Sequence, residues 1–270
     1  MLMRSYLYVP SDNEKFLEKA EDSPADAIIL DLEDSVKKDA KSRAEENIRQ
    51  FLQNTNRQHL MIRLDPLRIS YVEDLINNPK ISKIFLPKVD SVRAIDLLNL
   101  HNSENKPVHA LIESPLGLAN LEEIAKTRNV STLGVGEADF FAETVMSVSA
   151  NKALIDFVRS KVVLTSAALN LLPPIAPVSS NFKELEIYRN DSQELLTMGF
   201  WGRACIHPAQ VEIANSVFRV DPLLLRKAHH IVQSLREGTR GALVDDEGKM
   251  IDAAHLRWAE KYIKLGSISE

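Results

Sequence analysis

Three apolar runs in the sequence end on carboxylate side chains. The runs are residues 27–30, 108–112 and 132–135, and the acidic residues that follow them are Asp31, Glu33 and Asp34, then Glu113, then Glu137 and Asp139. Continuous apolar runs are typical of buried parallel strands, and in a barrel of such strands the chemistry lies at their carboxyl ends. Several carboxylates in one pocket are tolerable only with a divalent cation or shared protons. The pattern therefore predicts an enzyme with a hard metal ion.

Glu113 and Asp139 are the expected metal ligands. Two carboxylates completed by waters and substrate oxygens suit Mg²⁺, with Mn²⁺ as the alternative. Each carboxylate has a second interpretation as a cap for the helix after its strand. The metal prediction therefore rests on these two residues taken together with Asp31, Glu33 and Asp34. Glu137 competes with Asp139, and spacing does not decide between them. Glu33 and Asp34 are expected to order the site or to hold waters around the metal.

Two cations and one histidine near the ends of other runs have competing interpretations. Arg63 lies in an apolar run, where a cation is costly unless it meets an anion; it either pairs with Asp65 or binds a substrate oxyanion. Lys88 has the same two interpretations, and the ion pair is favoured. His207 precedes Pro208, where a local structural contact is favoured over a base or a metal ligand.

The elements that must position these residues alternate along most of the chain. The strand-like runs are residues 6–9, 27–32, 59–64, 83–87, 108–112, 131–135, 175–178 and 200–206, and helical patterns cover residues 15–21, 39–53, 71–76, 92–100, 117–127 and 152–171. Eight alternations favour an α/β fold of the TIM (β/α)8 barrel type over a doubly wound open sheet.

The barrel is predicted to cover residues 1–210, and residues 211–270 are expected to form a C-terminal lid. Helices are expected near residues 210–217, 221–237 and 253–265, with a small hairpin between the last two. The lid is expected to pack on a neighbouring subunit.

Composition excludes several classes of protein. A net charge of -5 gives no basic surface for nucleic acid. No apolar run approaches the roughly 20 residues of a membrane span. The N-terminal residues lack the pattern of a signal peptide, so a cytoplasmic location is expected. The single cysteine, Cys205, excludes an intrachain disulfide and a cysteine-based zinc site.

Six motifs, in this order, resemble the citrate lyase β-subunit-like lyases of the HpcH/HpaI aldolase superfamily. They are RSYLYVP at residues 4–10, LDLEDSV at 30–36, IRL at 62–64, LPK at 86–88, ALIESPLG at 110–117 and CIHPAQ at 205–210. The resemblance implies a TIM barrel, a magnesium ion and retro-Claisen-type cleavage of a β-hydroxyacyl thioester. It also implies a homo-oligomer, trimeric or hexameric, whose subunits share their lids.

Carried over by position, the resemblance assigns roles to individual residues. Glu113 and Asp139 would bind the metal, and Arg63 would stabilise the oxyanion that forms as the carbon–carbon bond breaks. Arg4 and Pro10 would lie near the thioester or its carrier. Met250-Ile251-Asp252 matches a lid motif whose Asp enters the neighbouring subunit's site and handles the proton at the enolate carbon. The alternative for Asp252 is a cap on the helix that follows.

Departures from the family pattern bear on the substrate. Asp65 stands where relatives often carry Asn, residues 136–139 read Gly-Glu-Ala-Asp instead of Gly-Ala-Glu-Asp, and Ala253-Ala254 follows the lid motif. Residues 172–181 lack the Asp-rich stretch of the true citrate lyase subunit and are more similar to stand-alone citramalyl-CoA lyases.

The predicted reaction is cleavage of an acyl-CoA, either (S)-citramalyl-CoA to acetyl-CoA and pyruvate or malyl-CoA to acetyl-CoA and glyoxylate. The alternatives are a citrate lyase β subunit acting on an acyl carrier protein, a malyl or citramalyl thioester hydrolase, and a carrier-binding subunit that serves assembly.

Overall fold

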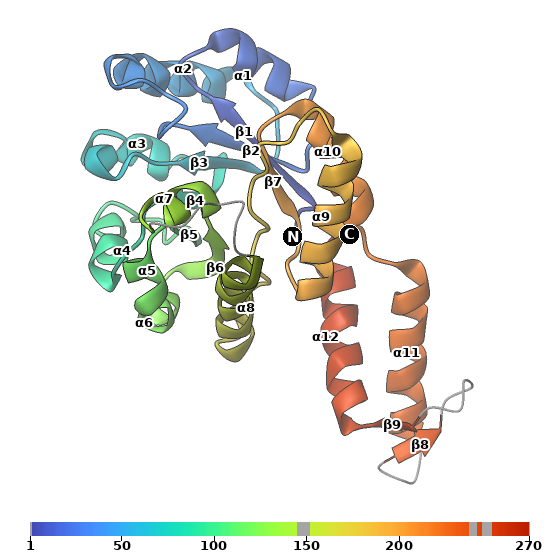
Figure 1. Ribbon diagram of the computed structural model, residues 1–270. Helices are drawn as coiled ribbons and strands as arrows, with labels where there is room; N and C mark the ends of the chain where they lie inside the picture. The colour runs from blue at the N-terminus through green and yellow to red at the C-terminus, as the bar shows by residue number, and fades with distance from the viewer. Residues whose placement is uncertain (1, 145–151, 238–241, 245–249, 270) are drawn as a thin grey trace. The chain divides into compact units, whose positions relative to one another are not determined.

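The computed structural model of the protein describes residues 2–144, 152–237, 242–244 and 250–269. These form two compact units, one of Arg4–Phe218 and one of Met1–Met3 with Arg219–Glu270. Each unit has its own secondary structure (Figure 1).

The larger unit is built on a parallel sheet whose strands follow each other around a curve. The order is β6-β5-β4-β3-β2-β1-β7. The strands are β1 (Ser5–Pro10), β2 (Ala27–Asp31), β3 (Leu60–Arg63), β4 (Ile81–Leu86), β5 (Val108–Ile112), β6 (Val130–Val135) and β7 (Arg203–Cys205). Seven of the eight predicted runs therefore form strands, in the predicted order.

The remaining run, predicted at residues 175–178, forms no regular strand but still fills the gap between β6 and β7. Leu172 N and Ile175 N donate to Ser131 O and Leu133 O on the β6 side, both at 3.1 Å. On the β7 side, Ala176 makes a parallel bridge to Arg203.

Proline explains the irregularity of this segment. Positions 173, 174 and 177 are prolines, which have no N–H to donate to a ladder. The segment therefore closes the ring through a few backbone hydrogen bonds. The TIM-barrel-like fold is confirmed, with one irregular segment in the place of the eighth strand.

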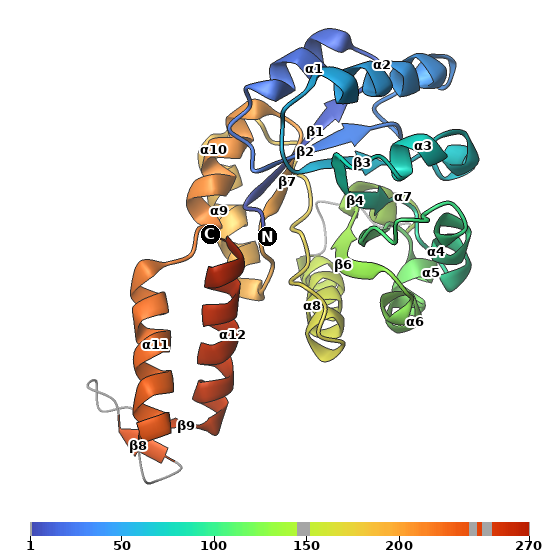
Figure 2. The same cartoon turned by 180° about the vertical axis from the view of Figure 1, so that it is seen from behind.

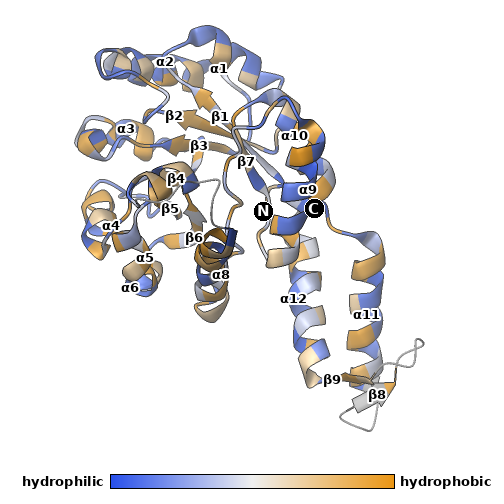
Figure 3. Cartoon of the chain, viewed as in Figure 1, coloured by the Kyte–Doolittle hydropathy of each residue, from blue (hydrophilic) through white to orange (hydrophobic). Residues whose placement is uncertain are grey.

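The helices of the larger unit lie outside the strands (Figure 1 and Figure 2). They are α1 (Glu14–Glu21), α2 (Lys41–Asn54), α3 (Glu73–Ile76), α4 (Val92–Asn99), α5 (Pro115–Ala119), α6 (Leu121–Lys126), α7 (Glu137–Ala142), α8 (Lys152–Ala168), α9 (Leu185–Met198) and α10 (Pro208–Val217). Figure 3 shows apolar strands and helices with one polar and one apolar side. Outward side chains of the strands, such as Ile28 and Ile62, and helix residues such as Ile48 form one fully buried core.

Two helices of this unit, α7 and α9, lie outside the predicted set. In α9 the buried side chains Tyr188, Ser192 and Leu195 recur at helical spacing, and Gly199 ends the helix with φ +108°. That spacing and a C-terminal glycine are the signals that predict such a helix.

Helix α10 belongs to the larger unit, beyond the boundary after residue 210 that the sequence suggested. Its Asn215 ties it to the amino-terminal end of the strands. Ser5 Oγ donates to Asn215 Oδ1 at 2.7 Å, and Asn215 Nδ2 donates to Pro24 O at 2.9 Å. Val211, Ala214 and Phe218 also belong to the buried core of the larger unit.

The smaller unit contains two long helices and a two-stranded antiparallel sheet. The elements are α11 (Pro222–Glu237), β8 (Ala242–Val244), β9 (Met250–Asp252) and α12 (Ala253–Ser269). Ala228, Ile231, Ile251 and Ala259 form its buried cluster. The predicted hairpin is present as β8 and β9, while its Glu-Gly turn lies outside the described residues. Among the described residues, no helix is long and apolar enough to cross a membrane.

Candidate active site

A cavity of about 230 Å³ opens at the carboxyl ends of the strands of the larger unit. The polar residues of its lining are Tyr8, Asp31, Ser35, Arg63, His109, Glu113, Glu137 and Asp139. The rest of the lining is largely apolar and includes Leu111, Val135, Ile175, Pro177, Val178 and Ile206. The site thus lies where the chemistry of a parallel barrel is expected.

Arg63 is held by the carboxylates of the second strand. The register of β2 and β3 sets Asp31 beside Arg63, and Arg63 Nε and Nη2 donate to the two Asp31 oxygens at 2.6 and 2.5 Å. Arg63 Nη1 lies 3.2 Å from Glu33 Oε2, and the guanidinium carbon lies 4.7 Å from the centre of the Tyr8 ring. Burial lowers the pKa of Arg63, but the hydrogen bonds and charge of Asp31 outweigh it and leave the pKa raised.

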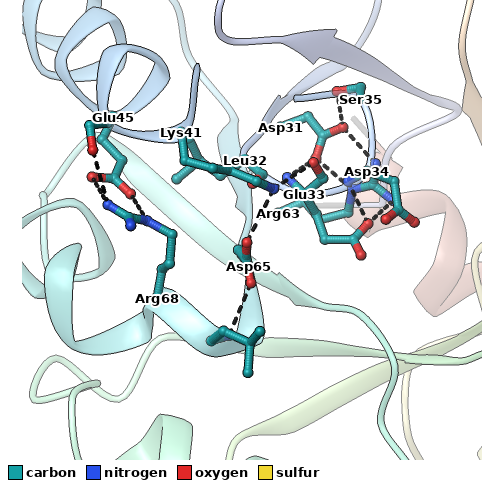
Figure 4. A network of polar contacts seen from close by, with 12 residues as sticks. Asp31, Leu32, Glu33, Asp34, Ser35, Lys41, Glu45, Arg63, Asp65 and Arg68 are labelled. Carbon is teal, nitrogen blue, oxygen red and sulfur yellow. Dashed lines mark hydrogen bonds and ion pairs between the residues drawn. The ribbon is translucent and has the colours of Figure 1, made fainter. Parts of the chain in front are cut away.

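Of the two interpretations of Arg63, the pairing with Asp65 is therefore wrong, because the partner of Arg63 is Asp31. Asp65 lies beyond the end of β3, where its side chain accepts a hydrogen bond from Leu67 N at 3.0 Å. Its other partner is Lys41, whose Nζ lies 3.1 Å from Asp65 Oδ2. Figure 4 shows this pair separate from the contacts between Arg63 and Asp31.

Lys88 balances the remaining carboxylates of the same region. Its Nζ donates to Glu33 Oε1 and, at 3.0 Å, to Asp34 Oδ1. The ion-pair interpretation of Lys88 is confirmed, and Glu33 lies between two cations. The Asp31–Glu33–Asp34 cluster and its two cations form what we call the balanced rim.

Glu113 follows β5 and also lines the cavity. Only 5% of it is exposed, and its Oε2 accepts a hydrogen bond from Lys88 N at 2.7 Å. Burial raises the pKa of Glu113 to about 7, and the neighbouring charge of Asp139 adds to the rise. A Cβ on Gly136 would lie 2.3 Å from Glu113 Oε1, so only glycine fits beside this carboxylate.

Glu137 and Asp139 are separated by their partners. Arg159 on α8 donates to both oxygens of Glu137, at 2.6 and 3.0 Å. The carboxylate of Asp139, in the first turn of α7, is exposed and makes no hydrogen bond or ion pair with the residues that the structure describes. Within the part of the chain that the structure describes, the negative charge of Glu137 is thus matched and that of Asp139 is not. We call Glu113 and Asp139 the open rim.

The open rim fits a hard cation. It offers a buried carboxylate of raised pKa beside an exposed carboxylate without a protein partner. No group of three or more His, Cys, Asp or Glu side chains in the described parts of the chain is arranged around a metal position. Two oxygen ligands that leave room for waters and substrate suit Mg²⁺ and do not resemble a closed zinc site.

The remaining predicted residues are distributed over the molecule. Pro10 ends β1 and lines the cavity. Arg4 precedes β1, so it lies at the opposite, amino-terminal end of the strands, where Asp26 holds it through hydrogen bonds of 2.7 and 2.8 Å. Its expected place beside the thioester is not supported, because parallel strands carry their active site at the carboxyl ends.

His207 and Asp252 both have local structural partners. His207 Nδ1 accepts a hydrogen bond from Ala209 N at 3.1 Å, and its ring stacks on Phe182, as the favoured interpretation holds. Asp252 belongs to the smaller unit and accepts hydrogen bonds from Ala254 N at 2.9 Å and His255 N at 3.3 Å. The capping interpretation of Asp252 is therefore confirmed within the chain itself.

Two cavity residues, Tyr8 and His109, lie outside the predicted set. Both are in strands, and both line the cavity. The signal for each is a polar group at an inward position of an otherwise apolar run, because side chains of a strand alternate between the two faces of the sheet.

The HpcH/HpaI aldolase/citrate lyase family model matches residues 4–208. The chain belongs to this family. A (3S)-malyl-CoA thioesterase of Cereibacter sphaeroides is 31% identical over 265 residues, which cover 94% of this chain and 90% of that protein. An L-malyl-CoA/beta-methylmalyl-CoA lyase of Rhodobacter capsulatus is 27% identical over 307 residues, covering 100% and 96%.

Solved structures of the family share the fold. The CitE protein of Mycobacterium tuberculosis, in complex with magnesium, acetoacetate and coenzyme A, superposes with a TM-score of 0.77 at 23% identity and covers 98% of both chains. The citrate lyase beta subunit complexed with oxaloacetate and magnesium, from the same organism, has a TM-score of 0.69 at 23% identity and covers 81% of this chain and 97% of its own. The predicted family and fold are thus confirmed.

Proposed function

We propose that the protein is a magnesium-dependent carbon–carbon lyase that cleaves (S)-citramalyl-CoA to acetyl-CoA and pyruvate. Membership of the family supports the lyase chemistry, and a relative named as a malyl-CoA lyase over the full length of the chain supports a CoA thioester. The observation that carries the choice is the cavity, in which an open pair of carboxylates and a charged arginine face an apolar wall.

The reaction breaks the bond between the carbinol carbon and the carbon next to the thioester. The hydroxyl proton leaves, the carbinol carbon becomes the ketone of pyruvate, and the electron pair of the broken bond goes to the thioester enolate. A proton on the enolate carbon then gives acetyl-CoA. When bound, Mg²⁺ supplies positive charge to substrate oxygens and orients them.

The protein's own groups serve this chemistry in separate ways. Glu113 and Asp139 would hold the ion on one side of the cavity. Arg63, already oriented by Asp31, places a fixed positive charge where an oxyanion forms, and such preorganised charge is a large term in catalysis. Glu33 and Asp34 position Arg63 and Lys88 through the ion pairs described above.

The apolar wall supports the citramalyl substrate over the malyl one. The carbinol carbon carries a methyl group in citramalyl-CoA and a hydrogen in malyl-CoA. Leu111, Val135, Ile175, Val178 and Ile206 supply an apolar surface for that methyl group. One methyl group in an apolar pocket changes kcat/KM by roughly 10- to 200-fold, and we expect a preference in that range.

Asp252 is proposed to handle the proton at the enolate carbon from a neighbouring subunit of a trimer or hexamer. The lid motif supports this role, while the hydrogen bonds within the smaller unit support only a helix cap. Asp252→Asn separates the two roles, because Asn caps a helix as well as Asp does but carries no charge. We expect Asp252→Asn to lose turnover by at least about 100-fold with an unchanged melting temperature.

Hybrid oligomers test whether Asp252 acts across subunits. Mixing Asp252→Asn and Arg63→Ala subunits should restore activity at sites that combine one intact barrel with one intact lid. Subunits that exchange, as shown by mass, without any regained activity would contradict the action in trans. Full activity of Asp252→Asn alone would leave the residue as a cap.

A product assay tests the function itself. Purified protein with Mg²⁺ and citramalyl-CoA should release pyruvate and acetyl-CoA in equal amounts. Free CoA without pyruvate would instead support a thioester hydrolase, the second candidate, which the 31% identity to a malyl-CoA thioesterase favours. Turnover only with an acyl carrier protein would favour a citrate lyase subunit.

A further inference from the structure

Three polar side chains are buried together inside the barrel, beside the cavity. They are Lys83 on β4, His109 on β5 and Thr132 on β6, with exposed fractions of 9%, 2% and 2%. Only His109 of the three lines the cavity. Burying polar groups of this kind costs free energy unless they are hydrogen-bonded to each other.

The three residues form a chain of contacts that runs from Lys83 through Thr132 to His109. Lys83 Nζ donates to Thr132 Oγ1 at 3.4 Å, and Thr132 Oγ1 lies 2.9 Å from His109 Nδ1. His109 and Thr132 are direct neighbours in the pairing of β5 with β6. The ring of His109 also packs on Phe85, with centroids 4.3 Å apart.

The orientation of the imidazole follows from Gly134. This residue lies two positions closer to the carboxyl end of β6 than Thr132, and a Cβ placed on it would be 2.6 Å from His109 Nε2. The Nδ1 edge of the ring therefore faces Thr132, on the amino-terminal side, and the Nε2 edge faces the carboxyl ends of the strands, where the cavity opens.

The proton positions depend on what the Thr132 hydroxyl donates to. Lys83 Nζ donates to Thr132 Oγ1, although burial lowers the pKa of Lys83 to about 8. The hydroxyl oxygen has two lone pairs and one proton, so either Thr132 donates to His109 Nδ1 or His109 Nδ1–H donates to Thr132; the first arrangement is the one proposed below, and the NMR test decides between them. A nitrogen that accepts has no proton, and a neutral imidazole then carries its proton on Nε2. Burial, followed by the charge of Lys83, lowers the pKa of His109 well below its ordinary value, which agrees with a neutral ring.

We propose that His109 is a neutral hydrogen-bond donor at the floor of the cavity and that its Nε2–H binds an oxygen of the 2-oxo acid half of the substrate. Thr132 and Lys83 are positioning residues that hold this tautomer. The assignment of the half rests on the proposed function: the CoA part is too long for a cavity of about 230 Å³, so the small oxo acid end occupies the floor.

The tautomer is tested without any substrate. Histidine-labelled protein has 7 histidines, and His109→Phe assigns the resonance of His109 in nitrogen NMR spectra. The expected signal is a neutral ring protonated at Nε2 between about pH 6 and about pH 8, the range in which an ordinary imidazole titrates. Thr132→Val should weaken that preference. A ring protonated at Nδ1, or an imidazolium in this range, would overturn the proposal.

Binding of pyruvate to the magnesium-loaded protein tests the contact. One lost hydrogen bond is worth about tenfold in affinity, so His109→Phe should raise the Kd of pyruvate about tenfold. Thr132→Val, which is nearly isosteric, should raise it by a smaller factor and keeps the test valid if His109→Phe does not fold. Unchanged affinity in either folded variant, or no pyruvate binding by the wild-type protein, would overturn the contact.

Lys106→Met is the matched control for Lys83→Met. Lys106 is also a buried lysine of the barrel, and its Nζ donates to Ile81 O at 2.6 Å, outside the cavity lining. Both variants should lose stability, but only Lys83→Met should change the His109 signal and the Kd of pyruvate. Equal effects of the two on these readouts would contradict the positioning role. A protein that keeps the tautomer and binds pyruvate but does not cleave citramalyl-CoA would disprove only the proposed function.

Discussion

Two groups of carboxylates at the carboxyl ends of the strands are in opposite electrostatic states. On the balanced rim, Asp31 and Glu33 meet Arg63 and Lys88 at hydrogen-bond distance. On the open rim, Glu113 has only a backbone N–H donor and Asp139 has no partner among the described residues. Buried carboxylates need compensation, and the described residues provide cationic partners for the balanced rim only.

The difference teaches which carboxylates are ready to receive an external cation. A carboxylate bonded to an arginine gives up that ion pair if it turns to a metal, whereas Glu113 and Asp139 give up none. The same comparison applies within one helical turn. Arg159 donates hydrogen bonds to both oxygens of Glu137, whereas Asp139 has no cationic partner among the described residues. For the proposed ligands, a place at a strand end is shared with the other carboxylates, and the absence of a cationic neighbour among the described residues is what distinguishes them.

Arg63→Met should break the balanced rim with the largest effect on stability. Asp31 is fully buried and the Arg63 side chain is 13% exposed, and removing one partner of a buried pair costs about 3–5 kcal/mol. Urea denaturation measures the change. Arg49→Met is the control, because the side chains of Arg49 and its partner Asp74 are 31% and 56% exposed, and it should cost about 1 kcal/mol or less. Equal losses would contradict the contrast.

Glu113→Gln should remove the open rim's capacity for a metal. Even residues that only support a ligand change metal affinity by about 10- to 100-fold, so the loss of a ligand is expected to weaken Mg²⁺ binding by at least about 100-fold. Calorimetric titration measures it, and Mn²⁺ gives a second readout by paramagnetic resonance. The matched control is Glu137→Gln, two residues from Asp139, which should change affinity much less than Glu113→Gln because Arg159 already holds Glu137. A larger loss of Mg²⁺ affinity in Glu137→Gln than in Glu113→Gln would mean that Glu137, and not Glu113, is the ligand.

Lys88→Met should have the smallest effect. Its side chain is 48% exposed, and Glu33 keeps its contact with Arg63 when Lys88 is removed. Exposed ion pairs contribute less than about 1 kcal/mol and weaken in salt, so the loss should shrink further at high ionic strength. A loss as large as that of Arg63→Met would mean that Lys88 contributes as much to the balanced rim as Arg63 does.

The sequence patterns predicted most of the strands and helices, because the spacing of apolar residues along the chain depends on which side chains a strand or a helix buries. Apolar runs and amphipathic helices alternate along the chain, and seven runs became strands in that order. The remaining run, at residues 175–178, did not form a regular strand, because prolines cannot donate to a ladder. Helix α9 had a periodic pattern, with buried Tyr188 and Leu195, that a closer reading of spacing detects.

The candidate site was less predictable, since its side chains meet across strands. The sequence proposed Asp65 as a partner of Arg63 because the two are neighbours in the chain, but strand register brought Asp31 to Arg63 instead. Arg4 looked like a site residue, yet its place before β1 sets it at the far end of the strands. His109 could not be assigned a role without Thr132 and Gly134 beside it.

The sequence by itself determined that acidic residues follow buried strands, that the strands alternate with helices, and that the chain resembles a family of metal-dependent lyases. Only the tertiary structure decided which of those acidic residues are neutralised. The physical reason is distance: an ion pair acts over a few ångströms, and the barrel brings Arg63 to Asp31 and Arg159 to Glu137 from 32 and 22 residues away.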